Sequence, residues 1–524
     1  MSETSPAPAS RIARATVTVM LAFLFSQLAG LAAKILTANA FGASAELDAF
    51  YAANRVAETL FALLAGGALS STFIPAFTSF IVRKDAAGAW KLAASVANLA
   101  VAVIGLAALL AGILAPLIVR YLLAPGFSDD PALFALTVSL LRIQLASAVI
   151  FALGALAMGI LNVHQVFLVP ALTPAVYQLG WIFGVQVLRP WLGIHGLAWG
   201  VILGSALYLL VQIPSLLKNG ARYSFSLGLH DPAVREVVRL MLPRMFGAAV
   251  VQLNFWVNTI LASDMGAGYL SGLTFGFQLM YMAQAAIAQS AATAAMPTFS
   301  RQHALGDTDG LRSSLAATLR GVILLSLPAA AGLILLRLPI VRLLYQHGQF
   351  SAEDTQLVAW ALLWYAAGLV FHSVLEVLVR AFYAQHDTRT PVLVGASAMG
   401  LNVALSIAFS ALFTRLGWLP HGGLALANSL ATALETTTLF LLMRKRLGGI
   451  HGAQILRGAG AALAGTAALV LALVYWLKGT LPLPVALTAL GGVALGGLAY
   501  GILLLLLRVP EVTGLLSAVR RRLQ

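Results

Sequence analysis

Apolar segments long enough to cross a membrane recur along the whole chain and constrain its fold more than any other feature. The hydrocarbon core of a bilayer is about 30 Å thick, and a helix of about 20 apolar residues crosses it. Backbone groups in lipid must be hydrogen-bonded within the segment, so we expect an all-α polytopic membrane protein. The predicted helices number fourteen, at roughly residues 17–40, 53–80, 92–119, 133–160, 167–187, 194–217, 237–262, 270–297, 315–336, 355–382, 391–413, 422–443, 455–477 and 482–507.

The composition excludes most enzyme classes. Hydrophobic residues make up 60% of the 524 residues and charged residues 10%, whereas a soluble domain carries about 25% charged residues. The chain has no cysteine, and its nine histidines form no paired-ligand pattern. It also lacks a Walker A loop, a GxSxG motif and a dinucleotide fingerprint. We therefore predict no catalytic residue, no metal site and no cofactor, and a transporter that runs on gradients or on substrate supply.

The net charge of +14 follows the positive-inside rule. The loops predicted on one side of the membrane carry most of the basic residues, and the loops predicted on the opposite side carry few. This asymmetry predicts that both termini are cytoplasmic, and it explains the charge without a nucleic-acid partner. The basic residues on the predicted cytoplasmic side are Arg11, Arg14, Arg83, Lys84, Lys91, Lys218, Arg222, Arg235, Arg239, Arg301, Arg312, Arg389, Arg444, Lys445, Arg446, Arg457 and Arg520 to Arg522.

The chain contains an internal repeat with a period of about 222 residues. Four landmarks keep their order and spacing, which indicates two homologous lobes. In membrane transporters, two such lobes related by a pseudo-twofold axis are typical of alternating access. The paired landmarks are Pro75 and Pro297, Phe127 and Phe350, Pro170 and Pro391, and Gly196 and Gly423.

Each repeat spans six predicted helices. Because six is even, both lobes enter the membrane in the same orientation, and the repeat is parallel. The last two helices have no counterpart in the repeat. The predicted organisation is a disordered tail at 1–15, an N-lobe at 16–217, a cytoplasmic linker at 218–236, a C-lobe at 237–447, and two final helices with a basic tail at 448–524.

Ionisable residues inside the N-lobe helices are candidates for substrate binding, because each costs about 2.5–3.5 kcal/mol at mid-membrane on insertion scales. Lys34, seven residues after Gln27, either reaches the interface or faces an aqueous cavity. Arg55 and Glu58 are three apart and can pair on one helix face. Asp48 either precedes and caps the second helix or has a functional role.

The C-lobe has a second set of polar residues. Asn254, Asn258 and Gln278 are candidate ligands, although such amides serve as often to join helices. The series His372, Glu376 and Arg380 aligns on one helix face and predicts either a structural network or a proton relay. Glu435 either finds a partner on another helix or stays protonated, and with this series it forms the candidate coupling residues.

Five sequence motifs occur in order over about residues 15–450. The most specific runs from Arg380-Ala381-Phe382-Tyr383-Ala384 to Asp387-Thr388-Arg389-Thr390-Pro391-Val392. The others are Phe41-Gly42-Ala43 with Asp48-Ala49-Phe50, Ala124-Pro125-Gly126-Phe127, Asn162 with Phe167, Pro170 and Pro174, and Leu344-Tyr345-Gln346-His347-Gly348-Gln349-Phe350-Ser351. Together these motifs resemble the MurJ/MviN family of lipid II flippases in the multidrug/oligosaccharidyl-lipid/polysaccharide exporter superfamily.

The resemblance implies export of undecaprenyl-pyrophosphate-linked peptidoglycan precursor across the bacterial cytoplasmic membrane, by rocking of two lobes around a central cavity. It also implies a monomer that contacts membrane lipids and the cell-wall synthesis machinery. The chain departs from the family at the cavity arginines, whose positions correspond to Gln27, Ala33, Phe61 and Gln278. This departure leaves two other functions open: export of a different polyprenyl-linked glycan, and cation-coupled antiport of small molecules.

Overall fold

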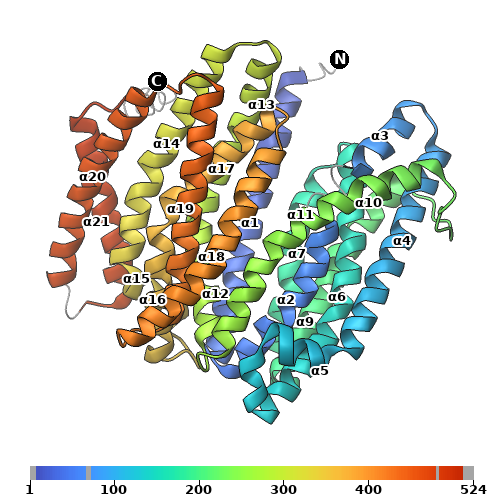
Figure 1. Cartoon of the computed structure of the whole chain (residues 1–524), viewed down its shortest axis with the longest axis horizontal. Helices are drawn as coiled ribbons and strands as arrows, with labels where there is room; N and C mark the ends of the chain where they lie inside the picture. The colour runs from blue at the N-terminus through green and yellow to red at the C-terminus, as the bar shows by residue number, and fades with distance from the viewer. Residues whose placement is uncertain (1–7, 66–71, 480–482, 512–524) are drawn as a thin grey trace, which may run out of the picture. The chain divides into compact units, whose positions relative to one another are not determined.

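The computed structural model describes residues 8–65, 72–479 and 483–511, and this part of the chain forms helices and no β-strand. It divides into two compact units, Met1–Ala267 and Gly268–Gln524. Unit 1 contains α1 to α11 and unit 2 contains α12 to α21 (Figure 1). The helix that the repeat places first in the C-lobe, α11, belongs to unit 1, where it packs on α2.

In unit 1, α2 and α9 pack on α6, while α7 lies between α1 and α9. A buried core under α3, α4 and α11 includes Phe73, Phe77, Trp90 and Ile160. The elements are α1 (Pro8–Phe41), α2 (Ala45–Ala65), α3 (Ile74–Val82), α4 (Ala86–Ile113), α5 (Ala115–Ile118), a π-helix (Val119–Leu123), a 3₁₀-helix (Pro125–Asp129), α6 (Pro131–Val163), α7 (Leu168–Phe183), a π-helix (Gly184–Leu188), α8 (Arg189–Leu192), α9 (Ile194–Leu210), α10 (Ile213–Lys218) and α11 (Pro232–Ser263).

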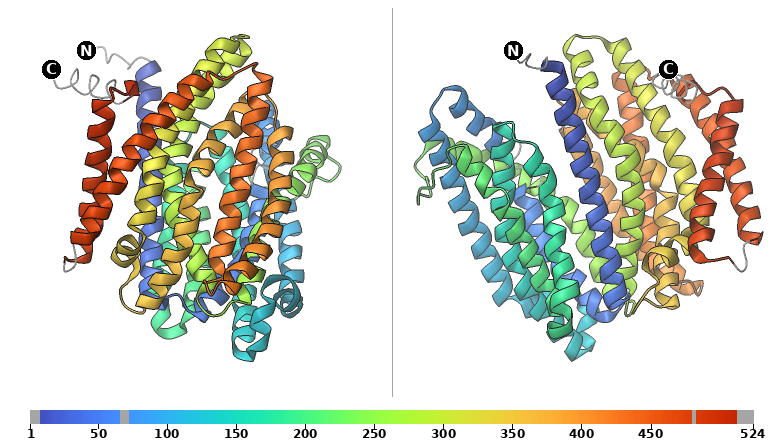
Figure 2. Two further views of the ribbon diagram at one scale, coloured as in Figure 1. Left: turned by 60° about the vertical axis from the view of Figure 1, so that its left-hand side comes forward. Right: turned by 180° about the vertical axis from the view of Figure 1, so that it is seen from behind.

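In unit 2, α14 packs on α13, α17 and α20, and α18 packs along α19. Figures 1 and 2 show α20 and α21 side by side at the edge of this unit, where Tyr500 Oη donates a 2.5 Å hydrogen bond to the Leu324 carbonyl of α14. The elements are α12 (Tyr269–Gln284), a π-helix (Ala285–Gln289), α13 (Ser290–Ala304), α14 (Thr308–Leu335), α15 (Arg337–Tyr345), α16 (Ala352–Ala367), α17 (Leu369–Ala384), α18 (Arg389–Arg415), α19 (His421–Arg446), α20 (Gly452–Gly479) and α21 (Val485–Leu506).

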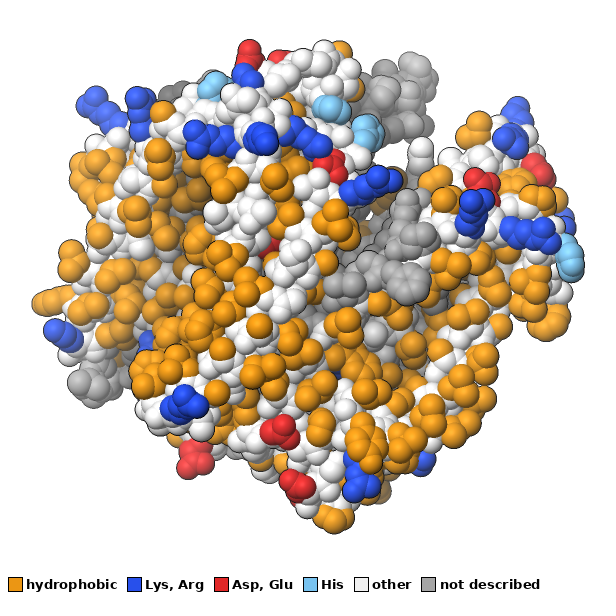
Figure 3. Space-filling model, in the orientation of Figure 1, with side chains coloured by type: hydrophobic (Ala, Val, Ile, Leu, Met, Phe, Trp, Pro, Cys, Tyr) orange, Lys and Arg blue, Asp and Glu red, His pale blue; other side chains and the backbone are white. Residues whose placement is uncertain are grey.

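Many of these helices are suited to a membrane. Within the described residues, nine helices are long and apolar enough to span it, or ten when α16 and α17, which meet at a 49° bend, are taken as one span. Each of the fourteen predicted segments overlaps at least one observed helix, so the all-helical membrane fold is confirmed. The number of fourteen spans stays a prediction. In Figure 3, apolar side chains cover the flanks of the helices of unit 2, and basic side chains gather at the end where α19 leads into α20.

The first helix begins earlier than predicted. The tail was expected to extend to residue 15, but α1 starts at Pro8. Proline is tolerated at the first helical position, and the following residues contain alanine and arginine, which are good helix formers. Residues 1–7 lie outside the described part of the chain.

The repeat is visible in helix boundaries that the sequence landmarks do not include. Helix α4 begins after Asp85, whose carboxylate accepts a 2.8 Å hydrogen bond from the Gly88 N–H. Helix α14 begins after Asp307, 222 residues later, which accepts a 2.8 Å bond from the Gly310 N–H. Both helices are 28 residues long. The same capping chemistry therefore sets the same helix in both units.

A glycine landmark has the same structural role in both units. Gly196 is the third residue of α9 and Gly423 the third residue of α19. A Cβ at Gly196 would lie 2.7 Å from the backbone of Leu188, and a Cβ at Gly423 would lie 2.6 Å from the backbone of Phe409. Both glycines thus allow the backbone of the preceding helical segment to come close, as small residues do between membrane helices.

The close contact at Gly423 predicts that Gly423→Ala destabilises the protein. The added methyl group would meet the backbone of α18, which cannot move as a flexible side chain can, so overpacking should cost about 1–3 kcal/mol. The measurement is the free energy of unfolding of the purified protein in detergent.

The control for this substitution is Gly400→Ala on α18, where nothing lies within 4 Å of the added Cβ. There alanine should be neutral or stabilising, because it is the better helix former by about 1 kcal/mol. Equal stability of the two variants would contradict the packing role of Gly423.

Candidate functional site

The Lys34 amine lies against two aromatic rings inside unit 1, those of Tyr51 and Trp181, which together are called the aromatic box below. Its Nζ lies 4.8 Å from the ring centroid of Tyr51 and 4.3 Å from that of Trp181. The Tyr51 hydroxyl is 3.5 Å from the same nitrogen. Cation–π contacts of this kind stabilise a partly desolvated charge. The lysine, which is partly buried, is thus held by protein groups.

The box is fixed by hydrogen bonds and packing from three helices. Trp181 of α7 donates a 2.8 Å bond through Nε1 to Thr37 Oγ1 of α1. Thr37 Oγ1 donates in turn to the Ala33 carbonyl at 2.8 Å. The Trp181 ring also meets Phe50 of α2 edge to face, with ring centroids 5.4 Å apart. Because the indole is locked on both sides, the position of the lysine amine is set by the fold.

Arg55, Glu58 and Asn54 form a polar group on α2. Arg55 Nη1 donates to Glu58 Oε2 at 2.8 Å, which confirms the predicted pairing of these two residues on one face. Asn54 Nδ2 donates to the other carboxylate oxygen at 2.6 Å. Arg55 Nε is buried and makes no hydrogen bond within the described residues. A buried donor without a partner carries a desolvation cost of about 1–3 kcal/mol, which an added acceptor would remove.

Helix α11 packs against this polar group of α2. The Phe255 ring lies 4.9 Å from Arg55 Cζ, and Trp256 Nε1 donates a 2.8 Å bond to Thr59 Oγ1 of α2. Asn258 Oδ1 is buried without a hydrogen-bond partner in the described part of the chain. Asn254, also predicted as a ligand, lies on α11, but its side chain is outside the described residues.

Two cations and one carboxylate of these groups act on one another in unit 1. Lys34 lies close enough to Arg55 and Glu58 for both to act on it electrostatically. Lys34, Arg55 and Glu58 together carry a formal charge of +1, and Asp48, buried on the same helix α2, is a further carboxylate. Charged groups inside a membrane protein are costly and mark a candidate functional site. The arrangement is suited to an anion that accepts hydrogen bonds from Arg55 Nε and from the lysine amine.

Two other predicted residues of the N-lobe have a different environment. Asp48 is buried at 1% exposure and belongs to the first turn of α2. The prediction that it precedes and caps the helix is wrong, because α2 begins at Ala45 and Ser44 Oγ accepts the bond from the Leu47 N–H at 3.3 Å. Gln27 lies partly buried on α1.

Unit 2 carries the predicted coupling residues on α17. Arg380 Nη1 donates to Glu376 Oε2, and the two form an ion pair. His372 instead makes a 3.2 Å hydrogen bond through Nε2 with Asn428 Oδ1 of α19. Gln284 of α12 donates to Glu376 Oε1 at 3.4 Å. The series therefore has the predicted ion pair and also joins three helices.

Two further residues of unit 2 make no hydrogen bond or ion pair within the described residues. Gln278 lies partly buried on α12. Glu435 lies partly buried on α19, with its Oε1 only 3.1 Å from where a Cβ on Gly395 of α18 would be. Tyr383 is within electrostatic reach of Glu435, Glu376 and Arg380. Within the described residues Glu435 is thus a carboxyl group without a counter-ion, and the Glu376–Arg380 ion pair does not include it.

The loop between α17 and α18 has a structural role. Asp387 accepts hydrogen bonds from the Thr390 N–H at 3.0 Å and from its hydroxyl at 2.7 Å. It also pairs with Arg446 Nη1 at 2.8 Å. These bonds, the Thr390 backbone bond first, hold the pKa of Asp387 below its usual range. The hydrogen bonds and ion pair of Asp387 thus hold the start of α18 against the end of α19.

The sequence did not predict the aromatic residues and amides that contact the cations of unit 1 and the α17 residues of unit 2. Tyr51, Trp181 and Phe255 surround the cations of unit 1, and Asn428 binds His372 in unit 2. Only Asn54 had a local pattern that could have indicated it, since it lies four residues before Glu58 on one face of α2.

The chain is similar to a family of known transporters. A family model described as "Lipid II flippase MurJ" matches residues 37–489. The lipid II flippase MurJ of Burkholderia cenocepacia is 33% identical over 441 residues, which cover 83% of this chain and 84% of that protein. A "Probable lipid II flippase MurJ" of Vibrio cholerae is 30% identical and covers 82% of each chain.

Two solved structures of membrane transporters have a fold similar to that of this chain. A lipid II flippase MurJ in an inward closed conformation matches with a TM-score of 0.79 at 26% identity, covering 93% of this chain and 98% of the other. An inward-facing multidrug resistance transporter of the MATE family has a TM-score of 0.67 at 16% identity, covering 82% of this chain and 98% of the other.

Proposed function

This chain belongs to the MurJ family of lipid II flippases, and we propose that it moves lipid II by alternating access and binds its pyrophosphate with Lys34 and Arg55. It is an integral protein of the inner membrane that translocates the lipid-linked peptidoglycan precursor. No reaction chemistry is required, because the substrate crosses the membrane unchanged.

The observation that carries the binding site is the buried Nε of Arg55. One terminal nitrogen of this guanidinium pairs with Glu58, while Nε has no acceptor in the described part of the chain. Once a helix movement of the transport cycle exposes this buried donor, a phosphate oxygen would satisfy it in a charge-assisted hydrogen bond, which is stronger than a neutral one. Lys34 adds a second positive charge nearby. A pyrophosphate, with two adjacent anionic groups, matches two separate cations.

The family's cavity arginines need not be present for such a site. Ala33 is fully buried, and the Phe61 ring packs on Phe151 with centroids 5.3 Å apart, so both positions have become packing positions. Lys34 follows Ala33 directly and turns about 100° away around the helix. We therefore infer that cationic recognition uses Lys34 and Arg55 in place of arginines at positions 33 and 61.

Substitution of either cation should weaken lipid II binding. Arg55→Gln and Lys34→Gln each remove one charge-assisted interaction, which corresponds to a loss of about tenfold to a hundredfold in affinity. The measurement is lipid II binding to the purified protein by native mass spectrometry, together with flipping in proteoliposomes. The control is Arg415→Gln at the exposed end of α18.

The variant Glu58→Gln tests whether Arg55 binds the substrate or only stabilises α2 through its ion pair with Glu58. Removing the carboxylate frees the Arg55 guanidinium for the substrate, so affinity for lipid II should stay equal or rise. If Glu58→Gln weakens binding as much as Arg55→Gln does, the pair is structural and the proposed site is wrong.

Glu435 is the residue that we propose for coupling to a proton or cation. Within the described residues it has no counter-ion, whereas Glu376 of α17 is paired with Arg380. Charging such a group inside a membrane segment is costly, so it favours a bound proton or a bound cation. Occupancy of this carboxyl would then respond to a gradient, while the Glu376–Arg380 ion pair keeps its own neutrality.

Glu435→Gln should abolish the response of flipping to an imposed proton or sodium gradient while lipid II binding is retained. The reason is that an amide cannot titrate and carries no charge for a cation. Flipping rates are measured in proteoliposomes with and without the gradient, and Glu353→Gln at an exposed position of α16 is the control. An unchanged gradient response in Glu435→Gln would remove this residue from coupling.

Both termini are proposed to lie in the cytoplasm, from the distribution of basic residues. The absence of cysteine makes this directly testable with single cysteines. A cysteine in place of Leu305, exposed in the turn between α13 and α14, should react with an impermeant maleimide only after cells are opened. A cysteine in place of Glu353 should react in intact cells. The reverse pattern would invert the orientation.

A further inference from the structure

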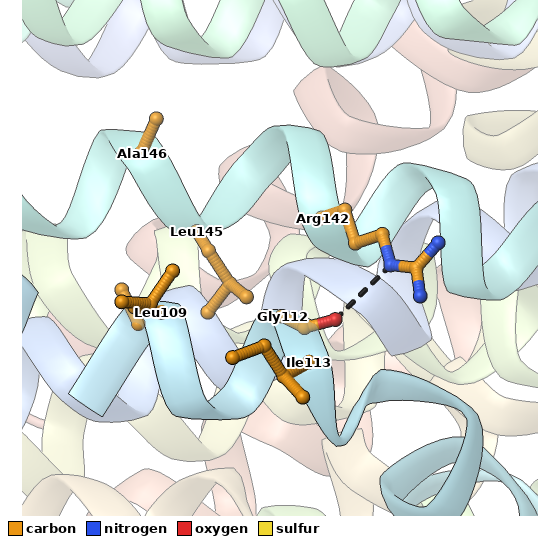
Figure 4. A pocket seen from close by; sticks show the side chains of 7 residues that line it. Leu109, Gly112, Ile113, Arg142, Leu145 and Ala146 are labelled. Carbon is orange, nitrogen blue, oxygen red and sulfur yellow. Dashed lines mark hydrogen bonds between the residues drawn. The ribbon is translucent and has the colours of Figure 1, made fainter. Parts of the chain in front are cut away.

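A groove on unit 1 lies between α4 and α6, away from the lysine and arginine described above. Its volume is about 530 Å³, within the range of about 300–1,000 Å³ that is typical of sites for small molecules. Apolar side chains line most of it, and the one charged residue is Arg142 (Figure 4). The remaining lining residues are Ala108, Leu109, Gly112, Ile113, Leu145 and Ala146.

Arg142 reaches from α6 to the end of α4. Its Nε donates a 3.0 Å hydrogen bond to the Gly112 carbonyl (Figure 4). That carbonyl would normally accept from the residue four positions later, but Pro116 has no N–H. The arginine therefore caps α4 with one nitrogen. Its terminal nitrogens make no hydrogen bond or ion pair in the part of the chain that is described, and the side chain is exposed.

Capping alone does not require this arrangement. In unit 2, the Ile334 carbonyl lies 222 residues after Gly112 and is also capped by an arginine. There Arg337 Nη1, only three residues away, donates at 2.7 Å. Arg142, in contrast, comes from a different helix and leaves its terminal nitrogens at the mouth of an apolar groove.

The groove lies at the level of lipid headgroups. Helix α4 starts at Ala86, next to the basic pair Arg83 and Lys84, and Gly112 is 26 residues further along. At about 1.5 Å per residue this corresponds to about 39 Å, close to the thickness of about 40 Å for a bilayer with its headgroup regions. Arg142 is therefore at the membrane face opposite Lys84.

We propose that this groove binds an anionic membrane glycerophospholipid such as phosphatidylglycerol. The phosphodiester accepts hydrogen bonds from the terminal nitrogens of Arg142, whose planar fork suits two phosphate oxygens. One acyl chain lies along Leu109, Leu145 and Ala146. No acidic side chain is among the described residues that line the groove, so the lining offers no carboxylate to the ammonium of a zwitterionic lipid.

The test compares lipid retention by native mass spectrometry of the full-length protein, with phosphatidylglycerol and phosphatidylethanolamine offered in equal amounts. Wild-type protein should retain phosphatidylglycerol preferentially. Ala146→Phe fills the groove at an exposed position without touching the Arg142–Gly112 bond and should lower that retention by about tenfold. Arg142→Gln should do the same, whereas Arg120→Gln, at another exposed arginine of unit 1, should not.

Four outcomes would overturn the proposal. Equal retention of the two lipids would remove the role of the charge. Wild-type retention in Ala146→Phe would remove the groove, and this variant is decisive because Arg142→Gln also loses the helix cap. Displacement of phosphatidylglycerol by added lipid II would assign the groove to the substrate, and displacement by millimolar inorganic phosphate would show that the acyl chain contributes nothing.

Discussion

The cost of holding charge in a low-dielectric segment governs the arrangement of α1, α2 and α7. An amine or guanidinium placed there needs partners that replace water. Lys34 obtains them from the faces of Tyr51 and Trp181, and Arg55 obtains one from Glu58 and a ring face from Phe255. The aromatic partners stabilise the cations without neutralising them, so in the proposed site their charges can act on an anion.

The rigidity of this arrangement depends on how closely the helices pack. Trp181 is part of α7, and α7 and the π-helix that follows it contact α9 through facing glycines. A Cβ at Gly180 would be 2.2 Å from the backbone of Gly204, and one at Gly184 would be 2.7 Å from Gly200. Close backbone contact strengthens dispersion between helices where no hydrophobic effect acts. It fixes α7 and therefore the indole that holds the lysine amine.

Local sequence patterns predicted the features that depend on nearby residues. The Arg55–Glu58 and Glu376–Arg380 pairs were predictable because residues three or four apart share a helix face. The repeat was predictable from prolines and glycines whose backbone constraints are local. The aromatic box was not, because Lys34, Tyr51 and Trp181 come from three helices and no spacing rule relates them. His372 was misleading for the same reason, since its partner Asn428 lies on α19.

The cost of placing charge in a low-dielectric segment also explains why this chain lacks the cavity arginines that the family resemblance implies. An arginine at position 33 would have to fit where Ala33 is fully buried beside the Thr37–Trp181 hydrogen bond. The next position along the helix points into the aromatic box, where a lysine is tolerated because its compact charge needs only ring faces and one hydroxyl. Arg55 keeps the planar fork, with Nε unpaired within the described residues. In the proposed site, Lys34 supplies a compact charge and Arg55 supplies the hydrogen-bond geometry, two properties that a single arginine would combine.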